Sequence, residues 1–191
     1  MGMTVQRRKD TKLPRVFIHK LADIRGGVSV NTTELGGDFL FEGTPLSAPT
    51  NGICNVIKVA EVTAAVTSSA TTIKVKKGHH FKVNDIVLTA EDAKAAKITA
   101  IDTSNSGYDS LTVNAALGTI SIGDFICQAT AEADGSTTKS ALKYAPFSLA
   151  GTGKAVIKGS NLDVDAWLIG VTKSNPLPAV VSNYIKGIIN Y

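Results

Sequence analysis

Apolar and polar residues alternate over short stretches of this chain, which is the pattern of β-strands with one buried face. In "TTIKVKKG", Ile73 and Val75 point to one side of an extended segment, while Lys74 and Lys76 point to the other. Twenty Thr, fourteen Ser and many Val and Ile fill such stretches, and turn residues interrupt them at about every 8–12 positions. The pattern predicts a mainly β protein, folded as a small β-barrel or a β-sandwich.

Three stretches also fit a helix. The stretch 53–66 is rich in Ala and Val, so helix is a weaker alternative to strand, and "AEDAKAA" (90–96) has the composition of one helical turn. The tail 179–191 fits a strand or a short helix, with strand favoured. Between them, "KITAIDTSNSGYDSLTV" reads as two strands joined by a hairpin turn at 104–107.

One sequence motif occurs twice. The stretch 71–90 ends in "FKVNDIVLTA" and the stretch 110–129 ends in "ISIGDFICQA", which aligns Asp85 with Asp124. Asn84 and Gly123 precede these aspartates and are residues that tolerate a positive φ. A pair of catalytic carboxylates would have to face each other across about 5–9.5 Å, and nothing in the sequence places them so. We therefore interpret both aspartates as turn formers in a duplicated β-unit.

The chain divides by composition into three parts. Residues 1–20 are expected to form an extended basic arm. Residues 21–130 are expected to form a β-domain that contains the duplicated unit. The polar stretch "TAEADGSTTKS" then introduces a C-terminal β segment, 131–191, which we expect to pack on the same domain.

Positive charge is concentrated in the arm. Its 20 residues carry six Lys or Arg against Asp10, a net charge of +5, whereas the other 171 residues sum to −1. This distribution argues against nucleic-acid binding through a folded basic face. It favours docking of the arm on an acidic protein surface, although a solvated tail or a cloning remnant remains an alternative. The docking residues expected are Arg7, Arg8, Lys9, Lys12 and Arg15.

The overall composition favours assembly with other proteins. Charged residues make up 19% of the chain and the mean hydropathy is +0.12, so some apolar surface is expected to be buried against partners. No apolar run approaches the ~20 residues that would cross a membrane, and no apolar stretch of a secretory signal follows the basic N-terminus. Cys54 and Cys127 lie in apolar strand-like runs and are expected to be buried thiols, a disulfide being the alternative.

No cofactor, metal site or catalytic residue is predicted. His79 and His80 are adjacent, so in a strand they would point to opposite faces, and we interpret them as solvated loop histidines. The stretch "SLAGTGKA" (148–155) lacks the first Gly and the final Ser or Thr of a phosphate-binding loop. The stretch "DTSNSG" from Asp102 lacks the Glu that closes a calcium loop, and "DVD" (163–165) is read as a solvated strand face.

Three phrases resemble the head-fibre and capsid-decoration proteins of tailed bacteriophages. They are "GGDFLFEGTPLS", the middle module "TIKVKKGHHFKVNDIV…ISIGDFI", and the close "NLDVDAWLIGVTKSNPLPAVVSNYIKGIINY". Together these phrases cover most of residues 26–191, and none of them is a catalytic signature. The resemblance implies a non-enzymatic, β-rich virion protein that binds the major capsid protein on the capsid exterior, often as a homotrimer. Such a protein is made in the cytoplasm of the bacterial host.

Two functions therefore remain as hypotheses. The first is a head fibre or decoration protein that attaches to the capsid through its N-terminal part, without nucleic acid or membrane as a partner. The second is a carbohydrate- or host-surface-binding β-module of a phage fibre, which would present aromatic rings on one face. Aromatic residues make up 6% of the chain and Trp167 is the one Trp, so the first hypothesis is favoured.

Overall fold

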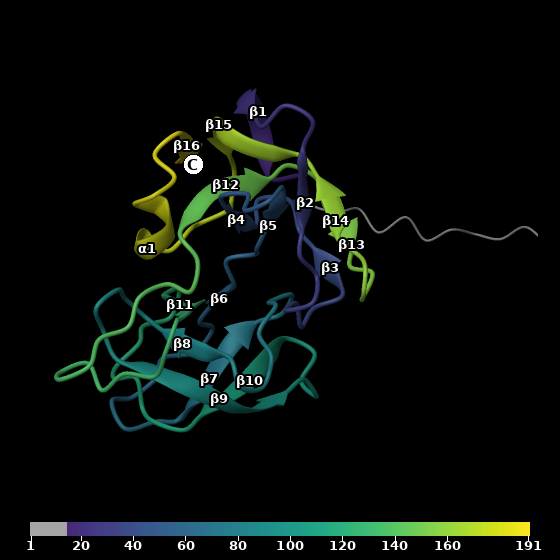
Figure 1. Cartoon of the computed structure of the whole chain (residues 1–191). Coiled ribbons are helices and arrows are strands. Elements are labelled where there is room, and N and C mark those ends of the chain that lie inside the picture. The colour runs from purple at the N-terminus through teal and green to yellow at the C-terminus, as the bar shows by residue number, and fades with distance from the viewer. Residues whose placement is uncertain (1–14) are drawn as a thin grey trace, which may run out of the picture.

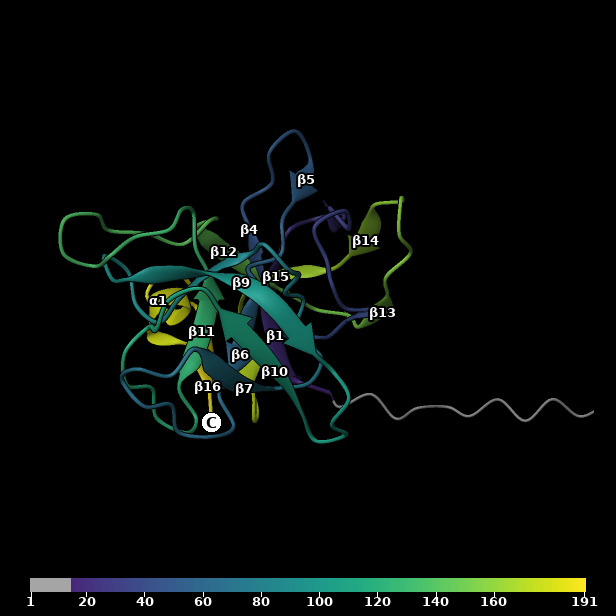
Figure 2. The same ribbon diagram turned by 90° about the horizontal axis from the view of Figure 1, so that it is seen from below.

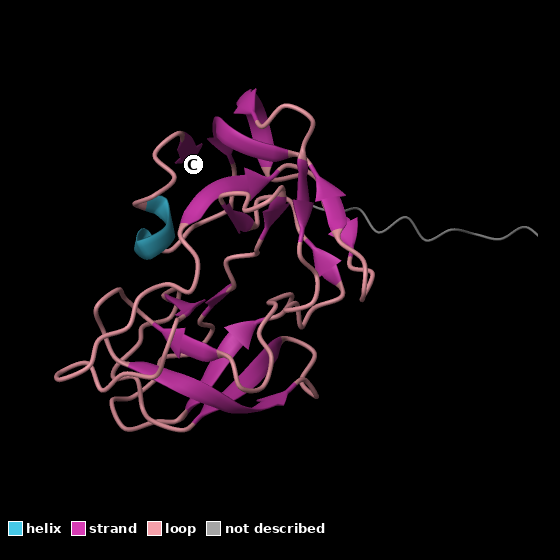
Figure 3. Ribbon diagram, viewed as in Figure 1, coloured by secondary structure: helices cyan, strands magenta, loops and turns pink. Residues whose placement is uncertain are grey.

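A computed structural model of the protein describes residues 15–191, and the strands in it form two lobes (Figure 1). Residues 59–143 form the central lobe. Residues 15–58 and 144–191 together form the terminal lobe, so both ends of the described chain lie in the same lobe. Regular structure in residues 15–191 is almost entirely strand, with one helix, α1 (Ala179–Ser182) (Figure 3). The prediction of a mainly β protein is confirmed.

The terminal lobe contains three sheets. The largest has the strand order β1-β15-β12-β4, with β16 added in parallel to β15. Its strands are β1 (Phe17–Asp23), β4 (Pro45–Ser47), β12 (Pro146–Ala150), β15 (Ala166–Thr172) and β16 (Ile188–Asn190). The second has the order β14-β2-β5, with β2 (Val28–Val30), β5 (Ile53–Cys54) and β14 (Leu162–Val164). The third pairs β3 (Phe39–Leu40) with β13 (Lys154–Ala155).

The central lobe is one antiparallel sheet with the strand order β6-β11-β8-β9-β10-β7. Its strands are β6 (Val59–Glu61), β7 (Thr72–Lys76), β8 (Ile86–Leu88), β9 (Ala95–Asp102), β10 (Tyr108–Val113) and β11 (Phe125–Gln128). Figure 2 looks onto this lobe from below. An isolated bridge joins Val62 to Val75 near the two outer strands. No continuous ladder of strand pairs follows from it, so none of the sheets in residues 15–191 closes into a barrel.

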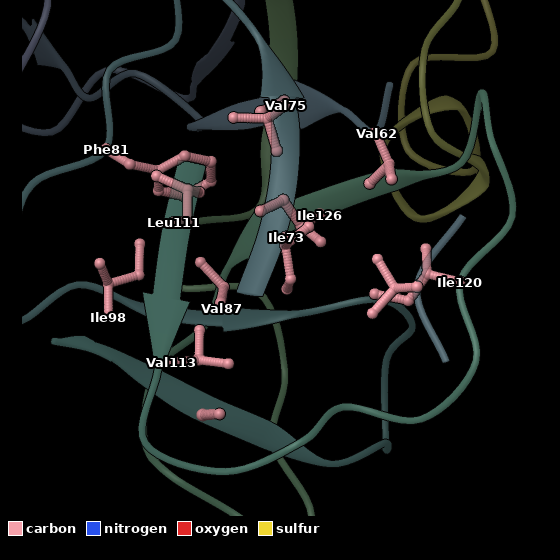
Figure 4. Close-up of a cluster of buried hydrophobic side chains, with 13 residues drawn as sticks. Val62, Ile73, Val75, Phe81, Val87, Ile98, Leu111, Val113, Ile120 and Ile126 are labelled. Atoms are coloured by element: carbon pink, nitrogen blue, oxygen red, sulfur yellow. The ribbon is translucent and has the colours of Figure 1, made fainter. Parts of the chain in front are cut away.

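The curved sheet of the central lobe encloses an aliphatic core (Figure 4). Ile73 and Val75 of β7 point into it and are fully buried, while their neighbours Lys74 and Lys76 are exposed, as the alternation predicts. The buried members are Ala60, Val62, Val66, Ile73, Val75, Phe81, Val87, Ala96, Ile98, Leu111, Val113, Ile120 and Ile126. Each strand of the lobe contributes at least one residue, so burial of this cluster holds the sheet in its curved form.

The duplicated unit is visible in the strand pairing. Stretch 71–90 contains β7 and β8, and stretch 110–129 contains most of β10 and all of β11. The first strands of the two copies pair with each other, and so do the second strands. The repeat therefore supplies two equivalent strand–turn–strand pieces, with β9 placed between β8 and β10 in the sheet.

The lobes meet at a junction of close backbone contacts. The Gly36 N–H donates to the His80 carbonyl at 3.0 Å, and a Cβ at Gly36 would lie 2.3 Å from the Phe81 carbonyl oxygen. Glu34 adds an ion pair with Lys143 at 2.8 Å. The glycine is needed here because any side chain would push the two backbones apart.

Helix α1 also contributes side chains to the junction between the lobes. Val181 is fully buried against Phe17 in the terminal lobe, and Val180 packs beside Leu88 of the central lobe. No helix in residues 15–191 has the length and apolar content needed to cross a membrane.

The structure corrects one helical prediction and decides the alternatives that the sequence left open. The stretch 90–96 forms no helical turn, because Ala95 and Ala96 begin β9 and are buried. The tail 179–191 contains both of the alternatives, α1 followed by β16. The stretch 53–66 is broken into β5 and β6, with no helix. β1 begins at Phe17, so the last residues of the expected arm 1–20 belong to a sheet.

The expected division into 21–130 and 131–191 stays a prediction. In the structure, residues after 130 pair with strands of both lobes. Residues 131–143 still bridge to the central lobe, with Ala133 opposite Ala95 and Leu142 opposite Ala129. The strands after residue 145, except β16, pair with strands that precede residue 58. The central lobe is therefore an insertion between two halves of the terminal lobe.

Candidate functional site

Of the predicted docking residues, Arg15 belongs to the part of the chain that the structure describes. Arg7, Arg8, Lys9 and Lys12 fall outside residues 15–191, which the structure describes. Arg15 is exposed and is separated from the start of β1 by Val16. Five of the seven residues of β1 are exposed, so the strand that follows the basic stretch is itself largely open to solvent.

A carboxylate fixes the backbone where β1 begins. The Glu42 carboxylate accepts hydrogen bonds from the N–H groups of Val16 at 3.2 Å and Phe17 at 3.3 Å. The Lys20 ammonium lies 3.9 Å from the same carboxylate and donates to the Gly151 carbonyl at 3.0 Å. The start of β1 is thus held by charge-assisted contacts.

The two matched aspartates form the same turn. Lys82 N–H donates to Asp85 Oδ2 at 2.8 Å, and Ser121 N–H donates to Asp124 Oδ2 at 2.8 Å. Asn84 and Gly123 adopt φ of 74° and 87° at the preceding position. The interpretation of both aspartates as turn formers is confirmed. The positive φ explains why Asn and Gly stand there, since most L-residues avoid it.

Asp85 has a second role that the sequence does not reveal. Lys58 is buried, with 1% of its side chain exposed, and its ammonium lies 2.7 Å from Asp85 Oδ2. Gln128 Nε2 donates to the other carboxylate oxygen at 3.0 Å. Burial lowers the pKa of Lys58, and the Asp85 carboxylate opposes that shift. Asp124 is exposed and has no such partner among the described residues, so the buried ion pair belongs to the first copy alone.

The prediction that His79 and His80 are solvated is wrong. The His79 side chain is 6% exposed and His80 is 4% exposed. His80 is buried because its ring lies against Gly37, where a Cβ would come within 3.0 Å of Nδ1. Burial, with help from the charge of Lys58, lowers the pKa of His80 to about 4. The Gly36-Gly37 pair was the signal in the sequence, because it permits close approach of another backbone.

His79 is tied to a carboxylate as well as to the backbone. Its Nδ1 accepts the Phe81 N–H at 3.2 Å, and its Nε2 lies 3.3 Å from Asp109 Oδ2. Burial lowers the pKa of His79, and Asp109 opposes that shift. Both histidines therefore act as interior residues of the lobe junction, and neither shows the grouping that a metal ion requires.

A cleft of about 180 Å³ opens beside the junction, lined by Lys58, Lys76, Lys77, both histidines and residues 41–45. Its lysines already have carboxylate partners. Lys58 pairs with Asp85, Lys76 with Glu61 and Lys77 with Asp109. The positive charges of the cleft are therefore neutralised by carboxylates, and the cleft has no excess positive charge that would attract an anion.

The glycines of "SLAGTGKA" serve aromatic packing. A Cβ at Gly151 would lie 2.2 Å from the indole of Trp167, and a Cβ at Gly153 would lie 3.0 Å from the ring of Phe39. Within this stretch, 148–150 belong to β12 and Lys154–Ala155 form β13, so the ordinary loop that the sequence predicts is 151–153.

The other acidic stretches serve local structure. Asp102 accepts the Ser104 N–H at 2.9 Å, and Asp165 accepts the Thr152 hydroxyl at 2.9 Å. No group of three or more metal-ligating side chains occurs within residues 15–191. These carboxylates act as turn and loop acceptors.

Both cysteines are buried free thiols, as predicted. Cys54 belongs to the core of the terminal lobe, and Cys127 packs beside Leu88 in the central lobe. Burial raises the pKa of both, to about 12 for Cys127. Neither thiol has the lowered pKa of a nucleophile.

No family model, no curated protein and no solved structure matches the chain.

Proposed function

We propose that this protein is a non-enzymatic structural component of a phage virion, attached to the outer surface of the capsid as a head fibre or decoration protein. One observation carries the proposal. The stretch with a net charge of +5 runs directly into β1, a sheet strand that is exposed at five of seven positions. A positively charged segment that continues into an open strand suits attachment to an acidic protein surface.

The partner in this proposal is the major capsid protein. Electrostatic attraction steers the encounter, and contacts of β1 and its neighbours then fix the orientation. The phrases that resemble head-fibre proteins lie in the terminal lobe and in the central lobe, so they support the proposal for both parts of the described chain. Homotrimer formation on the virion exterior belongs to the same proposal, because the resemblance implies it.

The test is co-sedimentation with heads assembled from the major capsid protein encoded in the same genome. The variant changes Arg7, Arg8, Lys9, Lys12 and Arg15 to Gln in the full chain. We expect its head binding to fall at least about ten-fold at low salt, with a weaker salt dependence than the unaltered protein. The control changes five exposed basic residues elsewhere to Gln, namely Arg25, Lys74, Lys139, Lys158 and Lys186. Equal binding by the two variants would overturn the role of the arm.

A second candidate function rests on a different observation. Phe39 and Phe41 form a tilted ring pair, 5.0 Å between centroids, in a groove of about 680 Å³ that Arg15 and Thr152 also line. Aromatic rings beside polar groups are a common arrangement for sugar binding. Binding to a glycan array that is lost in Phe41→Ala, together with no binding to heads, would favour this carbohydrate-binding module over the capsid protein.

A further inference from the structure

The sheet that contains β1, β15 and β16 has one buried face and one open face. Gly170 faces the buried side, where a Cβ would lie 3.0 Å from the ring of Phe17. Ile169 and Val171 flank Gly170 and therefore point to the opposite side. Val171 is paired with Ile189 of β16, which extends that side across the neighbouring strand.

This open side, which we name the outer face, is apolar. It consists of Ile169, Val171, Ile189 and Tyr191, of which Ile169 is 45% exposed and Ile189 is 64% exposed. Figure 1 places β1, β15 and β16 at the end of the terminal lobe away from the central lobe. Contiguous apolar residues of this kind on a folded surface mark a site of protein association.

Two bulges protect the unpaired edge of β1 against pairing with a strand of another molecule. The register of β1 against β15 skips Ile18 and Leu21, which are the extra residues of two bulges. Bulges twist an edge strand and hinder the addition of another strand. Association at this end of the molecule therefore involves the side chains of the sheet face and not the unpaired edge of β1.

The charge beside the outer face defines its partner. Lys173 follows β15 on this side, with its ammonium 6.0 Å from the ring centroid of Tyr191. Val16 lies at the same end, because its carbonyl accepts the Lys173 N–H at 2.9 Å. The exposed Arg15 precedes Val16, and the basic stretch 7–12 precedes Arg15. The apolar face is thus bordered by positive charge at the end where the arm joins.

We infer that the outer face docks on a partner protein that presents an apolar patch bordered by carboxylates. The inference rests on the proposed function, in which this partner is the major capsid protein, and it assigns a second contact beside the arm. Apolar burial supplies a part of the binding that salt does not screen, whereas the arm supplies the part that salt weakens. The two contacts can therefore be separated by measuring binding at two salt concentrations.

The variant Ile169→Ser/Ile189→Ser removes apolar side chains from the outer face. The matched control is Val83→Ser/Ile157→Ser, because Val83 is 48% exposed and Ile157 is 64% exposed at other places on the surface. Circular dichroism and thermal unfolding confirm that both variants are folded before binding to the heads is measured. We expect the outer-face variant to bind at least about ten-fold more weakly at both ~50 mM and ~500 mM salt. The control should stay within about two-fold of the unaltered protein.

Three outcomes would overturn the inference. Binding of the outer-face variant equal to that of the control would show that the face stays free on the capsid. A change in the sedimentation coefficient of the free protein, with unchanged head binding, would assign the face to a second copy of this chain. Failure of the unaltered protein to bind heads would overturn the proposed function, and the docking inference with it. This outcome differs from failure of the docking inference alone, in which the unaltered protein still binds heads.

Discussion

A lysine ammonium in a protein interior is stable only beside a carboxylate, and Lys58 is such a case. It lies between the two lobes, 1% exposed, 2.7 Å from Asp85. The same carboxylate also accepts the Lys82 N–H and the Gln128 amide. One side chain therefore closes a turn, neutralises a buried charge and holds a glutamine of β11. Removing its charge would leave Lys58 without compensation in a region of low dielectric.

Asp85→Asn should lower the free energy of unfolding by about 3–5 kcal/mol, because the turn is retained while the buried ammonium loses its counter-charge. Asp124→Asn is the control, since Asp124 occupies the same turn position without a lysine partner and should cost less than about 1 kcal/mol. Urea unfolding at pH 7 measures both. Equal costs for the two variants would contradict the role assigned to the ion pair. Adding Lys58→Met to Asp85→Asn should recover most of the loss.

At the scale of elements, the duplicated unit shows how a short phrase specifies a turn. Both copies place an exposed aliphatic residue first, Val83 or Ile122, and then a residue with positive φ. The next strand begins immediately after the aspartate, at Ile86 or Phe125. The turn is local, so its chemistry survives although the two copies bury different neighbours.

Exchange of turn residues between the copies tests this equivalence. Gly123 has φ of 87°, and a Cβ added there would have no atom within 4 Å, so backbone conformation alone decides what the position tolerates. Gly123→Asn should change the free energy of unfolding by less than about 0.5 kcal/mol, because Asn84 occupies the same conformation in the other copy. Gly123→Val should cost about 1–2 kcal/mol. Thermal unfolding measures both, and a Val variant as stable as the Asn variant would refute the explanation.

At the scale of the whole molecule, the junction joins two lobes that have separate cores. Groups of both lobes meet there: the buried His80 rests on Gly37, and the half-buried Glu34 is paired with Lys143. Besides burial, Lys58 and His79 lower the pKa of His80. Because His80 is buried in its neutral form, acid pH should act on the contact between the lobes.

The pH dependence follows from the direction of the pKa shift of His80. Its folded pKa of about 4 lies below the usual value near 6.5, so the unfolded chain binds the proton first as pH falls. This contribution to stability is present above about pH 6.5 and is lost as the pH falls toward about 4, which amounts to about 2 kcal/mol between pH 7.5 and 5. His80→Gln should flatten the profile by that amount, measured by urea unfolding at each pH. A pH profile of His80→Gln that matches that of the unaltered protein would contradict this explanation.

Most of the strand pattern was predictable from local sequence. The alternation in β7, the hairpin between β9 and β10 and the two matched turns depend on residues within a few positions of each other. Side-chain period and backbone φ preference are local properties, so the sequence expresses them directly. The buried thiols were predictable for the same reason, since each lies within an apolar run.

The contacts between distant segments were not predictable in this way. The sequence by itself determined a β protein with a repeated unit and a basic start. The tertiary structure decided that Lys58 meets Asp85 and that His80 lies on Gly37. It also decided that β15 places Ile169 and Val171 on an open face. These outcomes depend on which strands become neighbours, and strand pairing brings together residues that are up to 155 positions apart, as in Phe17 and Thr172. A polar residue shows no sign of such burial until its partner, far along the chain, is in place.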